Sequence, residues 1–213
     1  MTGPILAAVA ALAATPVQAW PDTGAGRRGA AAELRRFEAA LDHSESATAV
    51  LRAWCAEHRM ADPPVIRALR DAGPETPATP ETRRRLQAAP DERLRYRRVK
   101  LVCGDHVLSE ADNWYRPSVL TPEMNARLDG SDTPFGVAVK TLNFHRRTLG
   151  VDWLLKLDRR GAAGGELSLP HAVLRHRAVL ETAQAVPFSL VVETYTAEVL
   201  SGPPAAASEP VSR

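Results

Sequence analysis

The sequence predicts an α+β fold in which helices flank an antiparallel sheet. Strand-like runs come in neighbouring pairs: 94–103 and 107–115 enclose a Gly-Asp turn, and 173–183 and 187–200 follow a single run at 144–157. Helical segments lie between these pairs without the strand–helix–strand alternation of a parallel sheet. The chain of 213 residues is 45% hydrophobic and 24% charged, as expected for a soluble domain with a real core. We therefore expect one domain over residues 30–200.

Residues 1–19 are predicted to be a signal peptide. An apolar run over residues 5–14 precedes Val17-Gln18-Ala19, a small-residue cleavage pattern, although no Lys or Arg comes before the run. The run is shorter than the roughly 20 apolar residues of a membrane-spanning helix, so no stable membrane span is expected. Cleavage would give a periplasmic or secreted chain that begins at Trp20. The alternative is a cytoplasmic protein whose Ala-rich start forms a helix.

Two amphipathic helices are predicted before the first strand. Residues 20–29 are rich in Gly and Arg and are expected to be flexible. Residues 30–42 follow with helical spacing of the apolar side chains Leu34, Phe37 and Leu41. The next helix is expected over 44–59, with Ser44 as its N-cap. Its inward-facing side chains would be Val50, Leu51, Trp54 and Cys55.

The remaining segments carry local start and stop signals. Residues 62–73 have both a helix-start signal at Asp62-Pro63 and strand-like composition, so both assignments stay open. Residues 82–90 suit a short basic helix or a turn. Thr121-Pro122 starts a helix that ends at Gly130, and Thr133-Pro134 repeats that start. The Pro/Ala/Ser-rich residues 201–213 are expected to be a disordered tail.

Composition and spacing exclude several kinds of site. The six histidines lack metal-ligand spacing, no Cys-x-x-Cys pair exists, and no dinucleotide or nucleophile-elbow motif occurs, so neither metal nor cofactor is expected. The net charge of +2 and the aromatic content of 5% argue against a nucleic-acid partner. Cys55 and Cys103 lie in apolar patterns that favour buried free thiols. A disulfide is the alternative that export would permit.

Two charged residues stand out in strand-like surroundings. Alternation along the first hairpin arm puts Val99, Leu101 and Cys103 on the core face and Arg98 on the opposite face. Glu193 lies in the middle of an apolar strand, where an unpaired buried carboxylate would be very costly. Glu193 therefore either forms an ion pair with an Arg of a neighbouring strand or faces a cavity, where burial would raise its pKa.

From Pro90 onward the sequence resembles the chorismate pyruvate-lyase family. The motifs that carry the resemblance are "PDERLRYRRVKLVCGD", "ADNWYRPSVLTPEM" with "TPFG", and "RAVLETAQAVPFSLVVE"; "PPVIRALRDAG" resembles the first strand of that family. The resemblance implies that Arg98 binds a substrate carboxylate and that Glu193 is the active-site glutamate. It also implies substrate contacts from Phe135 and Arg177, and it favours a strand over the segment that follows Asp62.

The resemblance implies a chorismate lyase-like fold, which also serves as the effector-binding domain of some bacterial transcription regulators. The implied activity is cleavage of chorismate, or a related enolpyruvyl acid, to 4-hydroxybenzoate and pyruvate without a cofactor. Arg98 and Glu193 would then face each other across one cavity, with Phe135 at its rim. The insertion over 150–173 and the predicted signal peptide depart from the family pattern. The alternative function is non-catalytic, exported binding of a small aromatic carboxylate.

A third hypothesis is an anion-binding or nucleic-acid-binding surface. It ranks below the other two because clustered arginines more often form a solvated face. The residues involved would be Arg83, Arg84, Arg85, Arg93, Arg95 and Arg97.

Overall fold

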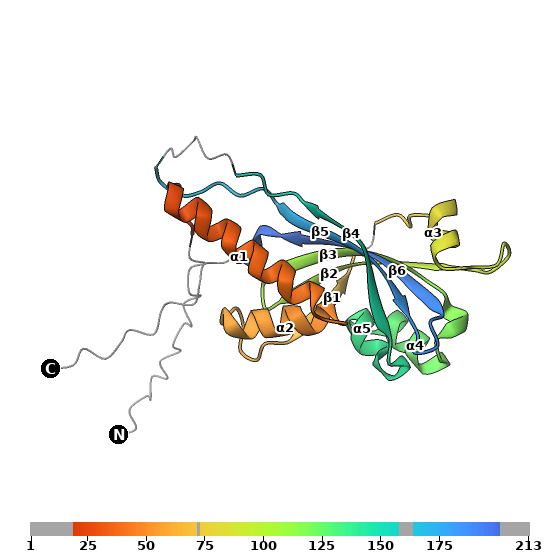
Figure 1. The fold of residues 1–213 in the computed structure, drawn as a ribbon. Coiled ribbons are helices and arrows are strands. Elements are labelled where there is room, and N and C mark those ends of the chain that lie inside the picture. The colour runs from red at the N-terminus through yellow and green to blue at the C-terminus, as the bar shows by residue number, and fades with distance from the viewer. Residues whose placement is uncertain (1–18, 72, 158–163, 201–213) are drawn as a thin grey trace, which may run out of the picture.

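A computed structural model of the chain describes residues 19–71, 73–157 and 164–200 (Figure 1). It contains one six-stranded sheet of order β1-β2-β3-β6-β5-β4, in which every neighbouring pair is antiparallel. The α+β class with an antiparallel sheet is therefore confirmed. The strands are β1 (Ile66–Arg70), β2 (Arg95–Cys103), β3 (His106–Tyr115), β4 (His145–Trp153), β5 (Ala172–Glu181) and β6 (Pro187–Thr196).

Most of the helical residues lie on one face of the sheet, and the short helix α3 contacts the other face only locally. The long helix α1 and the shorter α2 lie across one face, here called the inner face, and α4 and α5 gather near one end of the strands (Figure 1). Leu86, which caps the C-terminus of α3, packs with Val179 and Leu190 on the opposite, outer face. The helices are α1 (Gly24–Asp42), α2 (Ala47–Glu57), α3 (Pro80–Arg85), α4 (Pro122–Gly130) and α5 (Phe135–Ala138), with 3-10 turns at Pro117–Val119, Lys140–Leu142 and Ala197–Leu200.

The main hydrophobic core lies between the inner face and the first two helices. Leu34, Phe37 and Leu41 are buried along α1, as their spacing predicts. Phe37 packs edge-on against both Trp54 of α2 and Tyr195 of β6, with ring centroids 4.9 and 5.0 Å apart. Side chains from the two helices and from the sheet pack together in one layer. The inner face of the sheet therefore has little access to solvent except where a cavity opens.

Two local expectations about the first helices were wrong. The segment expected to be flexible over 20–29 is mostly helical, because α1 begins at Gly24 with the Thr23 hydroxyl accepting from Gly26 N at 3.1 Å. The N-cap of α2 is Ser46, whose hydroxyl accepts from Ala49 N at 3.3 Å. The Ser44 hydroxyl, two residues before this N-cap, instead donates to the Ser46 carbonyl oxygen and accepts from Ser46 N.

Other local signals are confirmed. The ambiguous segment after Asp62 forms strand β1, which pairs with β2. Residues 82–90 contribute the short helix α3. Thr121 caps α4, and its hydroxyl accepts from Met124 N at 3.2 Å.

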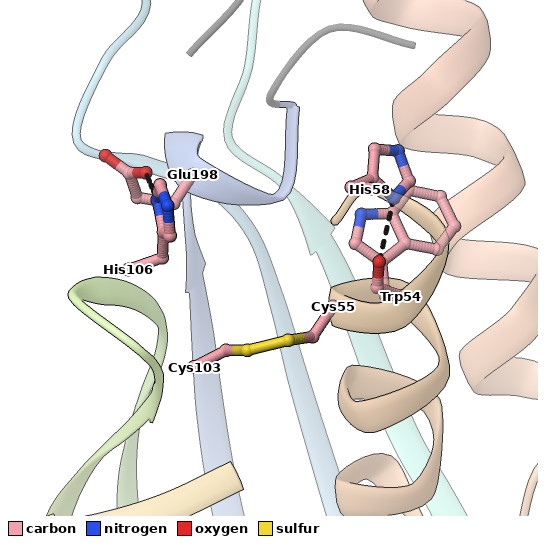
Figure 2. Close-up of a disulfide and its surroundings, with 6 residues drawn as sticks. All are labelled: Trp54, Cys55, His58, Cys103, His106 and Glu198. Carbon is pink, nitrogen blue, oxygen red and sulfur yellow. Dashed lines mark hydrogen bonds and ion pairs between the residues drawn. A yellow bond between two sulfur atoms is a disulfide. The ribbon is translucent and has the colours of Figure 1, made fainter. Parts of the chain in front are cut away.

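Cys55 and Cys103 form a disulfide, so the prediction of free thiols was wrong (Figure 2). Both residues are fully buried, and their Cα atoms lie 6.3 Å apart although 48 residues separate them in sequence. The apolar patterns correctly located both side chains in the core but carried no information on their mutual distance. The disulfide joins the C-terminal half of α2 to the end of β2.

Some expectations fall on residues that the structure does not describe. The predicted signal peptide lies outside the described residues apart from Ala19, and so does the predicted tail over 201–213. Within the described part of the chain, no helix is both long enough and apolar enough to cross a membrane.

Candidate functional site

Two adjoining cavities open beside the N-terminus of α2. The inner cavity, of about 50 Å³, lies against the inner face of β2, β3 and β6. The outer cavity is larger, about 700 Å³, and lies between α2, β1 and the segment from α4 to Lys140. Four residues line both cavities and mark the boundary where they adjoin, here called the neck: Ser46, Thr48, Gly136 and Phe144.

The inner cavity contains a buried arginine, Arg97, that lacks a carboxylate partner. Only 5% of Arg97 is exposed. Its Nη2 donates to the Thr133 carbonyl oxygen at 3.2 Å, and its Nε is buried without a hydrogen-bond partner. No ion pair joins Arg97 to an acidic side chain of the described residues. Burial, followed by the like charge of Arg70, lowers the pKa of the Arg97 guanidinium. An anion beside this guanidinium would remove both penalties.

A second arginine, Arg146, reaches the cavity from the edge strand β4. Its Nη2 donates to Glu193 Oε2 at 2.7 Å, and the two side chains are only 4% and 8% exposed. The hydroxyl of Tyr195 donates to the same oxygen at 3.2 Å. Arg146 Nε is buried without a partner. Glu193 therefore forms an ion pair with an arginine and also lines the cavity, but the arginine comes from β4, which β5 separates from β6, and not from a neighbouring strand.

A buried histidine, His176, lies behind this ion pair. His176 pairs with Glu193 across β5 and β6, and its ring lies edge-on to Tyr195 at 5.9 Å between centroids. His176 is fully buried, and neither ring nitrogen has a hydrogen-bond partner. Burial, followed by the charge of Arg146, lowers the pKa of His176, so the neutral ring is favoured.

The N-terminus of α2 forms another wall of the inner cavity. Ser46, Ala47 and Thr48 line it, and the first backbone N–H groups of a helix have no partner within the helix. The partial positive charge of a helix N-terminus favours anions. This wall and the two arginines supply positive charge to the inner cavity, whose lining also contains the carboxylates of Glu45 and Glu193. Arg146 donates to both carboxylates, through its backbone N–H to Glu45 and through its guanidinium to Glu193, whereas Arg97 has no such partner.

The sequence placed Arg98 in the cavity, and this expectation was wrong. Arg98 pairs with Asp112 in the sheet register, and its Nε forms an ion pair with Asp71 at 3.2 Å. Its side chain is 43% exposed on the outer face. Glu193 pairs with Ala111, which pairs with Val99, so Glu193 lies on the same face as Arg97 and not Arg98.

Arg177 also lies outside the cavity. It pairs with Val192 on the outer face, and its Nη2 lies 3.5 Å from Asp152 Oδ1 with both side chains about half exposed. Phe135, in contrast, lines the inner cavity together with Glu193, as expected. Its ring packs between Tyr115, at 5.3 Å between centroids, and Phe188, at 6.3 Å. The roles implied for these four residues remain proposals.

Sequence reasoning missed Arg97, Arg146 and the α2 wall. Strand alternation already placed Arg97 on the core face with Val99, which is an unusual position for a charged residue. Arg146 had no such signal, because its edge strand is mostly polar. The arginine surface considered as a third hypothesis is divided: Arg84 and Arg85 pair with Glu81, Arg95 pairs with Asp129, and Arg97 is buried.

The described residues contain no group of three or more His, Cys, Asp or Glu side chains that could hold a metal ion. The polar groups around the inner cavity are the guanidiniums of Arg97 and Arg146, the carboxylates of Glu45 and Glu193, the Tyr195 phenol and the N-terminus of α2.

Comparison with known proteins places the chain in a family. No protein-family model matches it. The uncharacterized protein y4mC of Sinorhizobium fredii (strain NBRC 101917 / NGR234) is 41% identical over 196 residues, which cover 87% of this chain and 83% of that protein. The chain belongs to the y4mC family.

Several solved structures are similar over part of the chain. The possible transcriptional regulator YydK from Bacillus subtilis is 15% identical, with a TM-score of 0.41, over 63% of this chain and 58% of that one. PhnF from Mycobacterium smegmatis is 12% identical, with a TM-score of 0.47, over 65% and 62%. The effector domain of PhnF alone gives 9% identity and a TM-score of 0.46 over 65% and 86%. The chain spans less than two thirds of the YydK and full PhnF chains.

Proposed function

We propose that this protein binds a small organic carboxylate, with the carboxylate group in the inner cavity, and that it does so without catalysis. The observation that carries the proposal is Arg97, a buried guanidinium with an unpaired Nε and no acidic partner among the described residues. Arginine binds carboxylates through two parallel hydrogen bonds, and buried polar groups are normally paired. A ligand carboxylate supplies the missing partner.

The volumes of the two cavities support this division of the ligand. About 50 Å³ holds a carboxylate group but not a whole aromatic acid. Pockets for small molecules usually have about 300–1,000 Å³, a range that includes the outer cavity of about 700 Å³. The body of the ligand therefore passes the neck into the outer cavity, and Phe144, which lines both cavities, offers it an aromatic contact.

Chorismate cleavage is the second candidate, because the family resemblance implies it and Glu193 lines the cavity. A glutamate acting on the leaving ether would have to donate a proton or position it. Here Glu193 Oε2 already accepts from Arg146 and Tyr195. Arg98, the implied carboxylate-binding residue, lies on the outer face. Both observations favour binding over turnover.

Calorimetric titration with 4-hydroxybenzoate tests the binding proposal. Wild-type protein is expected to bind, and Arg97→Gln is expected to weaken binding at least tenfold, since a charge-assisted pair contributes about 1.5–3 kcal/mol. Arg98→Gln is the matched control, because it removes the same charge one residue away on the outer face, and it should bind like the wild type. Loss of binding in Arg98→Gln with retention in Arg97→Gln would contradict the assignment.

Incubation with chorismate separates the two candidates. The binding protein is expected to leave chorismate intact, with no 4-hydroxybenzoate formed above the rate in buffer. Formation of 4-hydroxybenzoate that disappears in Glu193→Gln would replace binding by lyase activity as the function of the inner cavity.

A further inference from the structure

We propose that the outer cavity contains a second anion-binding subsite, so that the ligand carries an anionic group, a carboxylate or a phosphate, at each end. This inference rests on the proposed function, since it takes the first carboxylate to lie beside Arg97. It names the class of ligand as an elongated bis-anionic acid.

Charge on the walls of the outer cavity carries the inference. Arg52 of α2, Arg67 of β1 and Lys140 line it, and none of them forms an ion pair with a carboxylate of the described residues. Arg127 lines it as well, with its Nε donating to the Thr133 hydroxyl at 3.3 Å. Asp132 is the one acidic residue among the lining residues. Four cations around one concave volume attract an anion more strongly than the same cations on a flat surface.

The two cavities form one path for a ligand. The neck residues belong to both linings, and Gly136 contributes no side chain to the neck. A Cβ added at Gly136 would lie 3.5 Å from Ser46 Oγ and 3.7 Å from the Phe144 ring. A ligand seated on Arg97 therefore extends past Gly136 toward the cations of the outer cavity.

Exposed apolar side chains mark where the middle of the ligand lies. Val65 is 52% exposed and Val137 is 40% exposed, and both line the outer cavity with the buried Ile66. Large apolar side chains that remain exposed in a concave wall are typical of ligand pockets. An apolar or aromatic spacer between two anionic groups would cover them.

Four probes test the second subsite by calorimetric titration. Benzoate carries one anionic group, whereas terephthalate, 4-(carboxymethyl)benzoate and 4-(phosphonooxy)benzoate carry two at increasing separation. At least one two-anion probe is expected to bind about tenfold more tightly than benzoate, as two or three partly exposed ion pairs allow. The carboxylate and phosphate probes show which anionic group is preferred.

Two triple variants test which residues cause the tighter binding of the two-anion probes. Arg52→Gln, Arg67→Gln and Lys140→Gln together are expected to remove the advantage of the two-anion probe and to leave benzoate affinity within about twofold. The control combines Arg28→Gln, Arg35→Gln and Arg93→Gln, which removes equal charge from exposed positions that do not line either cavity. This control should keep the full advantage.

The neck is tested with one added methyl group. Gly136→Ala meets only ordinary contact distances, so the fold is expected to be retained, while passage of every probe narrows and affinities fall severalfold. Gly130→Ala is the control, because a Cβ there meets nothing within 4 Å. Unchanged affinity for all probes in Gly136→Ala would overturn the path through the neck.

The outcomes separate this inference from the proposed function. Equal binding of benzoate and all three two-anion probes, or an advantage that survives in the outer-cavity variant, would overturn the second subsite while leaving the inner site intact. Failure of all four probes to bind would overturn both proposals.

Discussion

Arg97 and Arg98 are neighbours in sequence but lie on opposite faces of β2. Side chains alternate along a strand, so a shift of one residue exchanges the core face and the solvent face. The family resemblance placed the carboxylate-binding role on Arg98, whereas the sheet register puts Arg97 on the face of Glu193. The register of the sheet therefore determines which of the two arginines faces the inner cavity.

Removal of either partner of the Arg146–Glu193 ion pair is expected to lower the stability of the fold strongly. Both side chains are almost fully buried, and loss of one partner from a buried pair typically costs about 3–5 kcal/mol. We expect Arg146→Met and Glu193→Leu each to lower the free energy of unfolding by that amount in urea titrations. The double variant should be more stable than either single one. A cost below 1 kcal/mol for both single variants would show that the pair is dispensable.

His176 is expected to make stability depend on pH. Burial lowers its pKa in the folded state, whereas the unfolded value stays near 6.5. The unfolded chain therefore binds a proton first, and the free energy of unfolding falls as pH drops below about 6.5, by up to about 1.4 kcal/mol per pH unit until the folded pKa is reached.

Urea unfolding at several pH values between 7.5 and 5 measures this effect. The difference between wild type and His176→Leu isolates it, because the carboxylates of both proteins titrate alike and cancel. The variant should lose less stability on acidification than the wild type. A difference that does not change with pH would contradict a neutral buried ring in the folded state.

At the scale of elements, the disulfide ties α2 to the sheet (Figure 2). The opposite end of α2 forms a wall of the inner cavity. The disulfide closes a loop between Cys55 and Cys103, whose sequence separation is 48. Closing such a loop lowers the entropy of the unfolded chain by the equivalent of about 4 kcal/mol. We expect Cys55→Ala with Cys103→Ala to unfold at lower urea concentration by roughly that free energy.

The double cysteine variant also provides its own control. Dithiothreitol should lower the stability of the wild type, at a rate limited by opening of the buried disulfide, and should leave the variant unchanged. Equal stability of wild type and variant without reductant would show that the disulfide adds nothing to the fold.

Elements with local signals could be predicted from sequence, and those that depend on distant contacts could not. Thr121-Pro122 marks the start of α4 because capping and proline act within one turn. The start of α1 was missed because Gly26 and Gly29, which suggested flexibility, are required by close neighbours: a Cβ would lie 2.0 Å from the Pro21 carbonyl oxygen and 2.3 Å from the Trp20 ring. The disulfide requires α2 and β2 to pack against each other, and no local sequence pattern predicts that contact.

At the scale of the whole molecule, the disulfide bears on where the protein resides. Disulfides persist in oxidising compartments and are rare where thiols are kept reduced. The sequence independently predicts cleavage after Ala19, just before Trp20. In the folded domain, the Trp20 indole Nε1 donates to the Leu200 carbonyl oxygen at 2.6 Å, and its own carbonyl accepts from Leu167 N at 2.7 Å. Trp20, the first residue after the predicted cleavage site, is therefore held in the folded domain.

We accordingly expect the mature protein to begin at Trp20 and to carry an oxidised Cys55–Cys103 pair. Intact-mass spectrometry of protein from the periplasmic or secreted fraction of its host, with free thiols alkylated before lysis, measures both features. The expected mass lacks residues 1–19 and contains no alkyl groups, because both sulfur atoms are bonded to each other. Protein that retains Met1, lies in the cytoplasmic fraction and takes up two alkyl groups would contradict export. The disulfide would then have to be assigned to a reducing compartment, where such bonds are usually transient.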